Sequence, residues 1–231
     1  MISQSQSVAS VVLDHSECAE VFARHRIDFC CRGNQSVEEA AKERDVPLDT
    51  LLSELRQAVE SRKEGGQGLP VADPRSLSTP RLVAYIIARH HEYLRRALPF
   101  VKGLAAKVAR VHGDHNPRLR DLDSAVATLT TTLLAHLDEE EETLFPLLTA
   151  KVRDGSTVQR LLCDMQDEHL QVAKTLEQIR AASEDFMIPD WACNSYRTLF
   201  SELRQIERDI FTHVHLENHV LVPRFGPDAA T

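Results

Sequence analysis

The sequence lacks any apolar run near the roughly 20 residues that a membrane-spanning helix needs. It also lacks an excess of basic residues, because its formal net charge is -8 and no Lys/Arg cluster stands out. A nucleic-acid-binding surface is therefore not expected. The first thirty residues contain Asp14, His15 and Glu17 where a signal peptide would place a basic and then an apolar segment. We expect a soluble cytoplasmic protein that binds neither nucleic acid nor membranes.

Cysteine is scarce and has no disulfide rhythm. The five cysteines are Cys18, Cys30, Cys31, Cys163 and Cys193. This odd number suits a reducing compartment. Cys30 and Cys31 are adjacent, so they cannot clamp a metal as a Cys-x-x-Cys motif does. They can supply exposed thiols beside Arg32 and near the start of the next helix, and both neighbours favour the thiolate.

Strand-like alternation is absent, and apolar residues instead recur at helical spacing. A stretch rich in Gly and Pro at 64–70, followed by Pro74, separates two parts. We predict an all-α protein with a small helical domain at 1–63, a linker at 64–78, a four-helix bundle at 79–225 and a tail at 226–231. A unit of about 60 residues is marginal alone, so it should dock on something or form a homodimer.

Capping residues predict where the helices begin. In the small domain, Asp14 with Glu17 is a plausible cap, Ser36 with Glu39 has capping-box spacing, and a last helix should run from Leu48 to Arg62. The bundle helices should begin at Thr79-Pro80, Asn116-Pro117, Gly155-Ser156 and Pro189-Asp190, and Pro223 should close the fourth. Short connections then give an up-down-up-down bundle.

Each bundle helix carries an apolar seam, in which apolar residues recur at steps of three and four. One histidine interrupts each seam, and in two of the four seams a glutamate follows it four residues later. The seams are Ala84, Ile87, His91, Leu94, Leu98, Val101, Ala105 and Val108; Leu122, Val126, Leu129, Leu133, His136, Glu140 and Leu147; Leu162, Met165, His169, Val172, Leu176 and Ile179; and Leu199, Leu203, Ile206, Ile210, His213, Glu217 and Val220. This spacing points the six polar groups where the leucines point, into the core.

Burying two carboxylates and four imidazoles without partners would cost several kcal/mol or force large pKa shifts. A bound metal pair removes that cost, and carboxylates suit iron or manganese and can bridge two ions. The predicted ligands are His91, His136, Glu140, His169, His213 and Glu217. Two histidines and shared carboxylates for each ion leave room for an oxo or hydroxo bridge and a small molecule. The pattern predicts a di-iron site.

A single histidine on an apolar face is more often a satisfied core residue, but six such groups on four seams are hard to explain separately. His90 lies about 100° from His91 around the helix, so we assign it to the flank or behind the ligands. In the acidic run 138–142 only Glu140 is on the seam. We predict that three further residues lie at the surface or behind the ligands: His215, His219 and Glu168.

The depth of the ligands in the fourth helix fits less well. They lie about 23 residues beyond Asp190, whereas His169 lies about 15 residues before the end of the third helix. At 1.5 Å per residue, the ligands of the two helices would differ in height by ~12 Å. Either the fourth helix begins later, or its first turns overhang the bundle.

These residues together resemble the iron–sulfur cluster repair di-iron proteins of the RIC family, the YtfE/ScdA type, over nearly the whole chain. The segment from Asp28 to Gly33 resembles the family's ScdA-type domain, although Arg32 stands where glycine is expected. The bundle resembles its hemerythrin-like domain through Arg89-His90-His91, His136 with Glu140 before Leu144-Phe145-Pro146, Glu168-His169, and His213 with Glu217-Asn218 before Pro223-Arg224. Val222 stands where phenylalanine is usual.

The resemblance implies a stress-response protein that restores iron–sulfur clusters damaged by nitric oxide or peroxide. Iron would pass from the same six ligands to damaged client proteins, with Cys30 and Cys31 assisting, without enzymatic turnover. Two alternatives stay open: a nitric oxide-reducing di-iron enzyme, and an oxygen carrier or sensor. Oxygen-binding relatives normally take a fifth histidine from the third helix, where Met165 and Ala173 flank His169.

Overall fold

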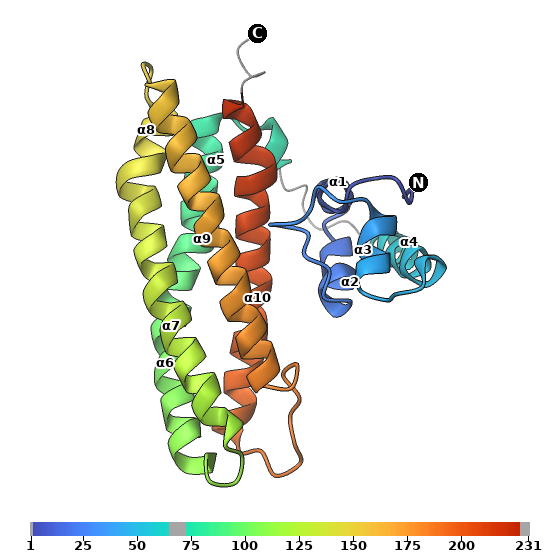
Figure 1. The fold of residues 1–231 in the computed structure, drawn as a ribbon, viewed down its shortest axis with the longest axis vertical. Coiled ribbons are helices and arrows are strands. Elements are labelled where there is room, and N and C mark those ends of the chain that lie inside the picture. Colours follow the sequence, from blue (N-terminus) through green and yellow to red (C-terminus); the bar gives the residue numbers. More distant parts are fainter. Residues whose placement is uncertain (1, 65–72, 227–231) are drawn as a thin grey trace. The chain divides into compact units, whose positions relative to one another are not determined.

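The computed structural model describes residues 2–64 and 73–226, and these are mainly helical (Figure 1). Most of the predicted linker and tail, 65–72 and 227–231, lies outside the described residues. Contacts between residues divide the chain into two units. One comprises Met1–Leu77 with Val214–Pro223, and the other Ser78–His213 with the residues from Arg224 onward. The boundary therefore falls within the last long helix.

The first unit contains four helices from the N-terminal part of the chain. These are α1 (Val8–Asp14), α2 (Cys18–Arg24), α3 (Val37–Glu43) and α4 (Leu48–Glu64). Helices α2 and α3 pack against α4. Phe22, Leu51 and Leu55 are fully buried in this small core. The predicted helix from Leu48 is confirmed, and its apolar face contributes Leu51, Leu52 and Leu55 to this core.

The predicted caps of this unit are partly right. Ser36 and Glu39 form the expected capping box at the start of α3. The Asp14 cap is wrong, because Asp14 is the last residue of α1 and its carboxylate accepts a hydrogen bond from Arg75. Glu17 is the N-cap residue of α2 but makes no capping hydrogen bond. The sequence analysis missed helix α1. This helix begins after Ser7, whose hydroxyl oxygen accepts a capping hydrogen bond from the Ser10 N–H.

The second unit is built on a four-helix bundle, and Figure 1 shows α6, α7, α9 and α10 as long rods side by side. In chain order, its elements with their continuation are α5 (Thr79–Ile86), η2 (Ile87–His91), α6 (Glu92–His112), α7 (Arg118–Glu139), η3 (Glu140–Leu144), α8 (Phe145–Thr149), α9 (Gly155–Ala182), α10 (Asn194–Leu216), η4 (Glu217–Leu221) and η5 (Val222–Phe225). Within the described residues the only strand-like feature is one isolated bridge, Ser7 with Ser36. The predicted all-α fold is confirmed.

The bundle helices begin close to the predicted positions, with two corrections. Helix α9 is capped by Asp154, whose carboxylate accepts from the Ser156 N–H, so the glycine after it is already helical. Helix α10 begins at Asn194, later than Asp190. The preceding loop contains three residues with positive φ, Glu184, Asp185 and Phe186, a conformation that no helix contains. Because α10 begins later than predicted, the height difference expected between its ligands and those of the third bundle helix becomes smaller.

Three segments of π-helix interrupt the rods, and each contains a predicted ligand. They are η2, η3 and η4, which contain His91, Glu140 and Glu217 respectively. A π turn adds one residue to the helical repeat and so rotates the residues beyond it. This explains why the predicted seam fails beside the ligands: Ala84 is exposed, while Ile86 is fully buried. Likewise Leu148 is buried instead of Leu147.

The rest of the bundle core is mainly apolar. Leu98, Val126 and Ile206 are fully buried, and each such side chain contributes roughly 1.5–3 kcal/mol to stability. Buried aromatic rings such as Phe200 add to this core, and the buried Glu207 forms an ion pair with Arg180. Across the described residues, no helix is both long and apolar enough to pass through a bilayer.

Candidate metal centre

The structure brings all six predicted ligands together inside the bundle. None is more than 5% exposed, and His91, His213 and Glu217 are fully buried. They come from every rod: η2, α7 with η3, α9, and α10 with η4. A buried cluster of imidazoles and carboxylates is stable only if its polar atoms are paired or bind a cation.

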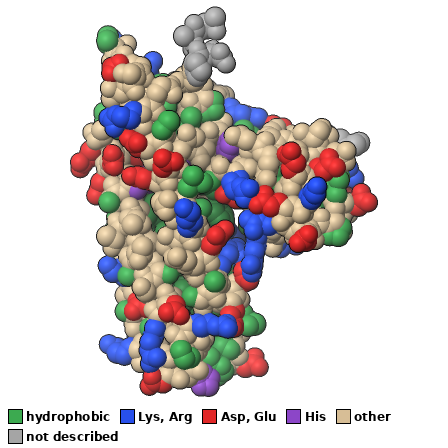
Figure 2. Space-filling model, in the orientation of Figure 1, with side chains coloured by type: hydrophobic (Ala, Val, Ile, Leu, Met, Phe, Trp, Pro, Cys, Tyr) green, Lys and Arg blue, Asp and Glu red, His purple; other side chains and the backbone are tan. Residues whose placement is uncertain are grey.

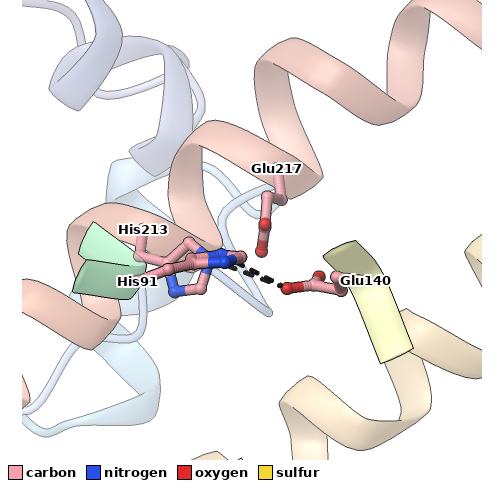
Figure 3. Close-up of side chains that lie close together, drawn as sticks. All are labelled: His91, Glu140, His213 and Glu217. Carbon is pink, nitrogen blue, oxygen red and sulfur yellow. Dashed lines mark hydrogen bonds and ion pairs between the residues drawn. The ribbon is translucent and has the colours of Figure 1, made fainter. Parts of the chain in front are cut away.

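The six side chains form two groups in which the potential ligand atoms lie within 4.8 Å of one another. One group contains His91, Glu140, His213 and Glu217; the other contains His136, Glu140, His169 and Glu217. Both carboxylates therefore belong to both groups. Figure 3 shows the first group, with the two imidazoles adjacent and both carboxylates pointing toward them.

The spacing within each histidine pair suits two ligands of one ion. The Nε2 atoms of His91 and His213 are 3.0 Å apart, and those of His136 and His169 are 3.2 Å apart. Two nitrogens that bind an ion at about 2.1 Å and at right angles are separated by about 3.0 Å. Each pair can therefore bind one metal ion.

The Glu140 carboxylate lies between the two pairs. Its Oε2 is 3.5 Å from His91 Nε2, and its Oε1 is 3.3 Å from His136 Nε2. Both oxygens are buried, and neither has a hydrogen-bond partner. Leaving a carboxylate in that state is expensive. One oxygen facing each histidine pair is the arrangement of a bridging ligand, so the residues present fit two metal ions.

Two further carboxylates hold the outer nitrogens of the ligand histidines. His91 Nδ1 donates to Glu141 Oε1 at 2.9 Å, and His136 Nδ1 donates to Glu168 Oε2 at 2.5 Å. These bonds fix the ring orientation and the tautomer, so that Nε2 is the ring nitrogen that can bind a metal. The hydrogen bond from His136 lowers the pKa of Glu168. Burial alone would raise the pKa of Glu141, but hydrogen bonds from His91 and Arg95 lower it overall.

The sequence analysis placed Glu168 at the surface or behind the ligands and gave Glu141 no role. Each accepts a hydrogen bond from a predicted ligand, so both lie behind the ligands. A signal was present, since each is the immediate neighbour of a predicted ligand, Glu140 or His169. A residue beside a ligand can reach a histidine on the adjacent helix.

His91, and not the adjacent His90, belongs to the first of the two groups. His90 is nevertheless buried, at 3% exposure, and its Nδ1 donates to Asp209 Oδ1 at 3.0 Å. The position predicted for it, behind the ligands, agrees with this contact.

The cysteine pair lies in a loop organised by Asp28. The Asp28 Oδ1 accepts from the backbone N–H groups of Cys30 and Cys31, at 2.9 and 2.8 Å, and from Cys30 Sγ at 3.0 Å. The two Sγ atoms are 3.7 Å apart. Cys30 is only 2% exposed, whereas Cys31 is half-buried.

The expectation of exposed thiolates is wrong for Cys30. Burial, the hydrogen bond with Cys31 and the nearby Asp28 charge all raise the pKa of the Cys30 thiol well above its usual value. Arg32, which was expected to favour a thiolate, forms an ion pair with Glu43 instead. The loop therefore holds Cys30 as a neutral thiol at neutral pH.

Side chains from 215–219 hold the backbone of this loop within the first unit. His215 Nδ1 donates to the Phe29 carbonyl at 3.1 Å, and His219 Nε2 and Asn218 Nδ2 donate to the Cys30 carbonyl at 2.8 and 3.1 Å. Burial first, and then the neighbouring His219, lower the pKa of His215 to about 4. Of the two positions predicted for His215, the surface is therefore wrong.

An acidic pocket opens beside the His136 group. Its lining residues are His136, Glu139, Glu140, Leu144, Leu161, Asp164, Met165 and Glu168. Figure 2 shows acidic side chains gathered on the side of the bundle where α7 and α9 lie. The lining includes two of the predicted ligands, His136 and Glu140, together with carboxylates that a cation can bind.

A four-helix bundle with histidine and glutamate ligands buried at one level defines a hemerythrin-like metal-binding protein. Comparison with known families agrees: residues 82–225 match the hemerythrin HHE cation binding domain, and residues 4–59 match ScdA_N, described as a domain of unknown function. The iron-sulfur cluster repair protein ScdA of Staphylococcus haemolyticus is 33% identical over 229 residues, covering 98% of this chain and 100% of the relative. The iron-sulfur cluster repair protein YtfE of Yersinia pseudotuberculosis is 30% identical, covering 96% of each chain. The chain belongs to this ScdA/YtfE family of hemerythrin-like proteins.

Proposed function

We propose that this protein repairs iron–sulfur clusters damaged by nitric oxide or peroxide, and that it does so by donating iron from a di-iron centre. One observation carries the proposal: Glu140 and Glu217 belong to both ligand groups, and each group adds two histidines. Shared carboxylates between two histidine pairs are what a bridged pair of metal ions requires. The relatives named as iron-sulfur cluster repair proteins supply the biological context.

In this centre His91 and His213 hold one iron, and His136 and His169 hold the other. Two histidines and two bridging carboxylates leave each iron short of six ligands, so the pair has room for an oxo or hydroxo bridge and a small exogenous molecule. When bound, the pair supplies exchangeable iron and open coordination positions. Glu141 and Glu168 orient His91 and His136 through their Nδ1 atoms.

The acidic pocket supports release of iron. Glu139 and Asp164 are among its lining residues, and Glu168 lies beside the predicted ligand His136. Carboxylates in succession offer a cation favourable oxygen ligands along the way out. A site meant only to hold metal needs no such opening, whereas a donor does.

The cysteine loop is the second functional element of the proposal. Cys31 is partly accessible, whereas Cys30 is buried. The two Sγ atoms are 3.7 Å apart, so a reaction at one sulfur changes the surroundings of the other. We assign to this pair an assisting role in transfer to a damaged client protein. Loss of both thiols should therefore impair repair and leave the metal ligands intact.

The test uses iron-loaded full-length protein and an acceptor whose [4Fe–4S] cluster has been damaged by nitric oxide. Recovery of the acceptor cluster and iron loss from the donor are measured together. The Cys30→Ser/Cys31→Ser double variant should keep its iron and lose repair, while a Cys163→Ser/Cys193→Ser control, which changes two exposed cysteines, should repair normally. If the protein keeps its iron and instead produces nitrous oxide continuously under a reductant, the proposal is wrong and nitric oxide reduction takes its place.

A further inference from the structure

His90 has the same surroundings as a metal ligand, although it belongs to neither ligand group. In His91 and His136 a carboxylate accepts the Nδ1–H, and Nε2 faces the centre. His90 repeats the first half of this arrangement, because its Nδ1 donates to Asp209 Oδ1 at 3.0 Å. A carboxylate oxygen accepts this bond, so the shared proton lies on Nδ1, and a neutral ring in this tautomer presents the lone pair of Nε2.

That lone pair has no hydrogen-bond partner. His90 Nε2 is a buried atom without a partner in the structure, and so are Tyr93 Oη and Asp209 Oδ2 in the immediate neighbourhood. Buried polar atoms are nearly always satisfied, and each exception costs about 1–3 kcal/mol. Three such atoms around one His–Asp pair indicate that something is bound there in part of the protein's working cycle.

The position of His90 indicates what is bound. Its ring stacks on the ring of the predicted ligand His213, with 5.7 Å between centroids and 9° between planes. Imidazole, phenol and carboxylate are the donor types that suit iron better than soft metals. An ion that leaves the His213 side of the centre therefore has a further nitrogen ligand one ring away.

We propose that His90 is a transit ligand, which binds an iron ion through Nε2 as the ion enters or leaves the di-iron centre. Asp209 positions the ring through Nδ1. The ion exchanges one protein ligand for another and remains partly coordinated, so it never has to leave all its ligands in one step. This inference rests on the proposed iron donation and adds the residue that makes the iron labile.

The experiment measures iron release from the anaerobically loaded full-length protein to an excess of a chromogenic iron(II) chelator. His90→Ala should bind two irons like the wild type and release them at least about tenfold more slowly, the size of effect that groups around a metal site produce. His90→Asn should behave in the same way, because its amide can keep the bond to Asp209 while the Nε2 lone pair is lost. His112→Ala, which removes a histidine that contacts Cys193 elsewhere in the bundle, is the matched control and should release iron at the wild-type rate.

Release at the wild-type rate from both folded His90 variants overturns the proposal, and so does loss of either iron at equilibrium. A lower melting temperature with unchanged release would show that His90 is structural only and would also overturn it. No client protein is present in this assay. A wild-type protein that never yields iron to the chelator would therefore contradict the proposed donation itself, which keeps the two failures apart.

Discussion

At the scale of single residues, Glu140 shows how the site trades stability for metal binding. Its two oxygens are buried without hydrogen-bond partners, and each faces a different histidine pair. The sequence placed this residue among the predicted ligands, because Glu140 stands four residues after His136 on an apolar seam. It could not predict Glu141 or Glu168 as orienting groups, since their hydrogen bonds depend on how neighbouring helices are rotated.

Replacing Glu140 with glutamine should therefore change stability in opposite directions with and without metal. The neutral amide removes a buried charge, so the metal-free variant should be about 1–3 kcal/mol more stable than the metal-free wild type. The amide is a poor bridging ligand, so iron content should fall well below two per chain. Iron analysis and thermal unfolding with and without a chelator check both effects. A variant that keeps two irons would contradict the bridging role.

The cysteines should differ sharply in their reactivity with pH. The raised pKa of Cys30 means that it stays protonated around pH 9.0, the ordinary value at which half of a free thiol is ionised. Alkylation by iodoacetamide requires the thiolate. At pH 9.0 the exposed Cys163 of the folded protein should therefore react much faster than Cys30, while unfolding in urea should remove the difference. Peptide mass spectrometry reads each site; equal rates for both in the folded protein would contradict the buried neutral thiol.

At the scale of elements, the π segments explain where sequence reasoning succeeded and where it failed. Period and capping predicted the four rods, and the side chains that they marked as ligands lie close together. The same period failed next to His91 and Glu140, where Ala84 and Leu147 were placed in the core but Ile86 and Leu148 are buried. A π turn inserts one residue into the helical repeat, and its position cannot be predicted from the local sequence pattern.

The cysteine loop depends on close approach at Gly33. A Cβ added there would lie 2.4 Å from the Phe29 carbonyl oxygen, 2.7 Å from Ala9 Cβ and 2.8 Å from His219 Nε2. Gly33→Ala should destabilise the protein by about 1–3 kcal/mol, because the loop backbone has to move. It should also speed alkylation of Cys30.

Gly103 provides the matched control for this change. It lies within α6, and a Cβ added there meets nothing within 4 Å. Gly103→Ala should therefore stabilise the protein by about 0.5–1 kcal/mol through helix propensity. Chemical denaturation of the two variants measures both signs. A Gly33→Ala protein as stable as Gly103→Ala would show that the loop tolerates a side chain and is not fixed by close contact.

At the scale of the whole molecule, the ligands connect parts of the chain that are far apart in sequence. Each rod of the bundle supplies at least one of the six, and Glu217 lies in the segment that groups with the N-terminal unit. Such a site is specified only when the whole bundle has formed. The candidate ligands could be proposed from the sequence because each helix shows its own apolar seam. That Glu140 and Glu217 belong to both ligand groups could not be predicted, because it depends on how all four rods pack together.

Metal removal should consequently destabilise the molecule as a whole. Without ions, two buried carboxylates and four imidazoles must find partners among themselves or admit water, which costs several kcal/mol. Bound ions add stability by mass action, about 2.7 kcal/mol for each at a free concentration of 100 Kd. Calorimetry should show a lower melting temperature for the chelated protein and a rise that scales with the logarithm of added iron(II). Manganese(II) should restore much of the stability, because it accepts the same nitrogen and oxygen ligands, yet it should fail to restore an iron–sulfur acceptor. Equal melting temperatures with and without metal would mean that the buried ligands are satisfied by one another, and the di-iron interpretation would then fail.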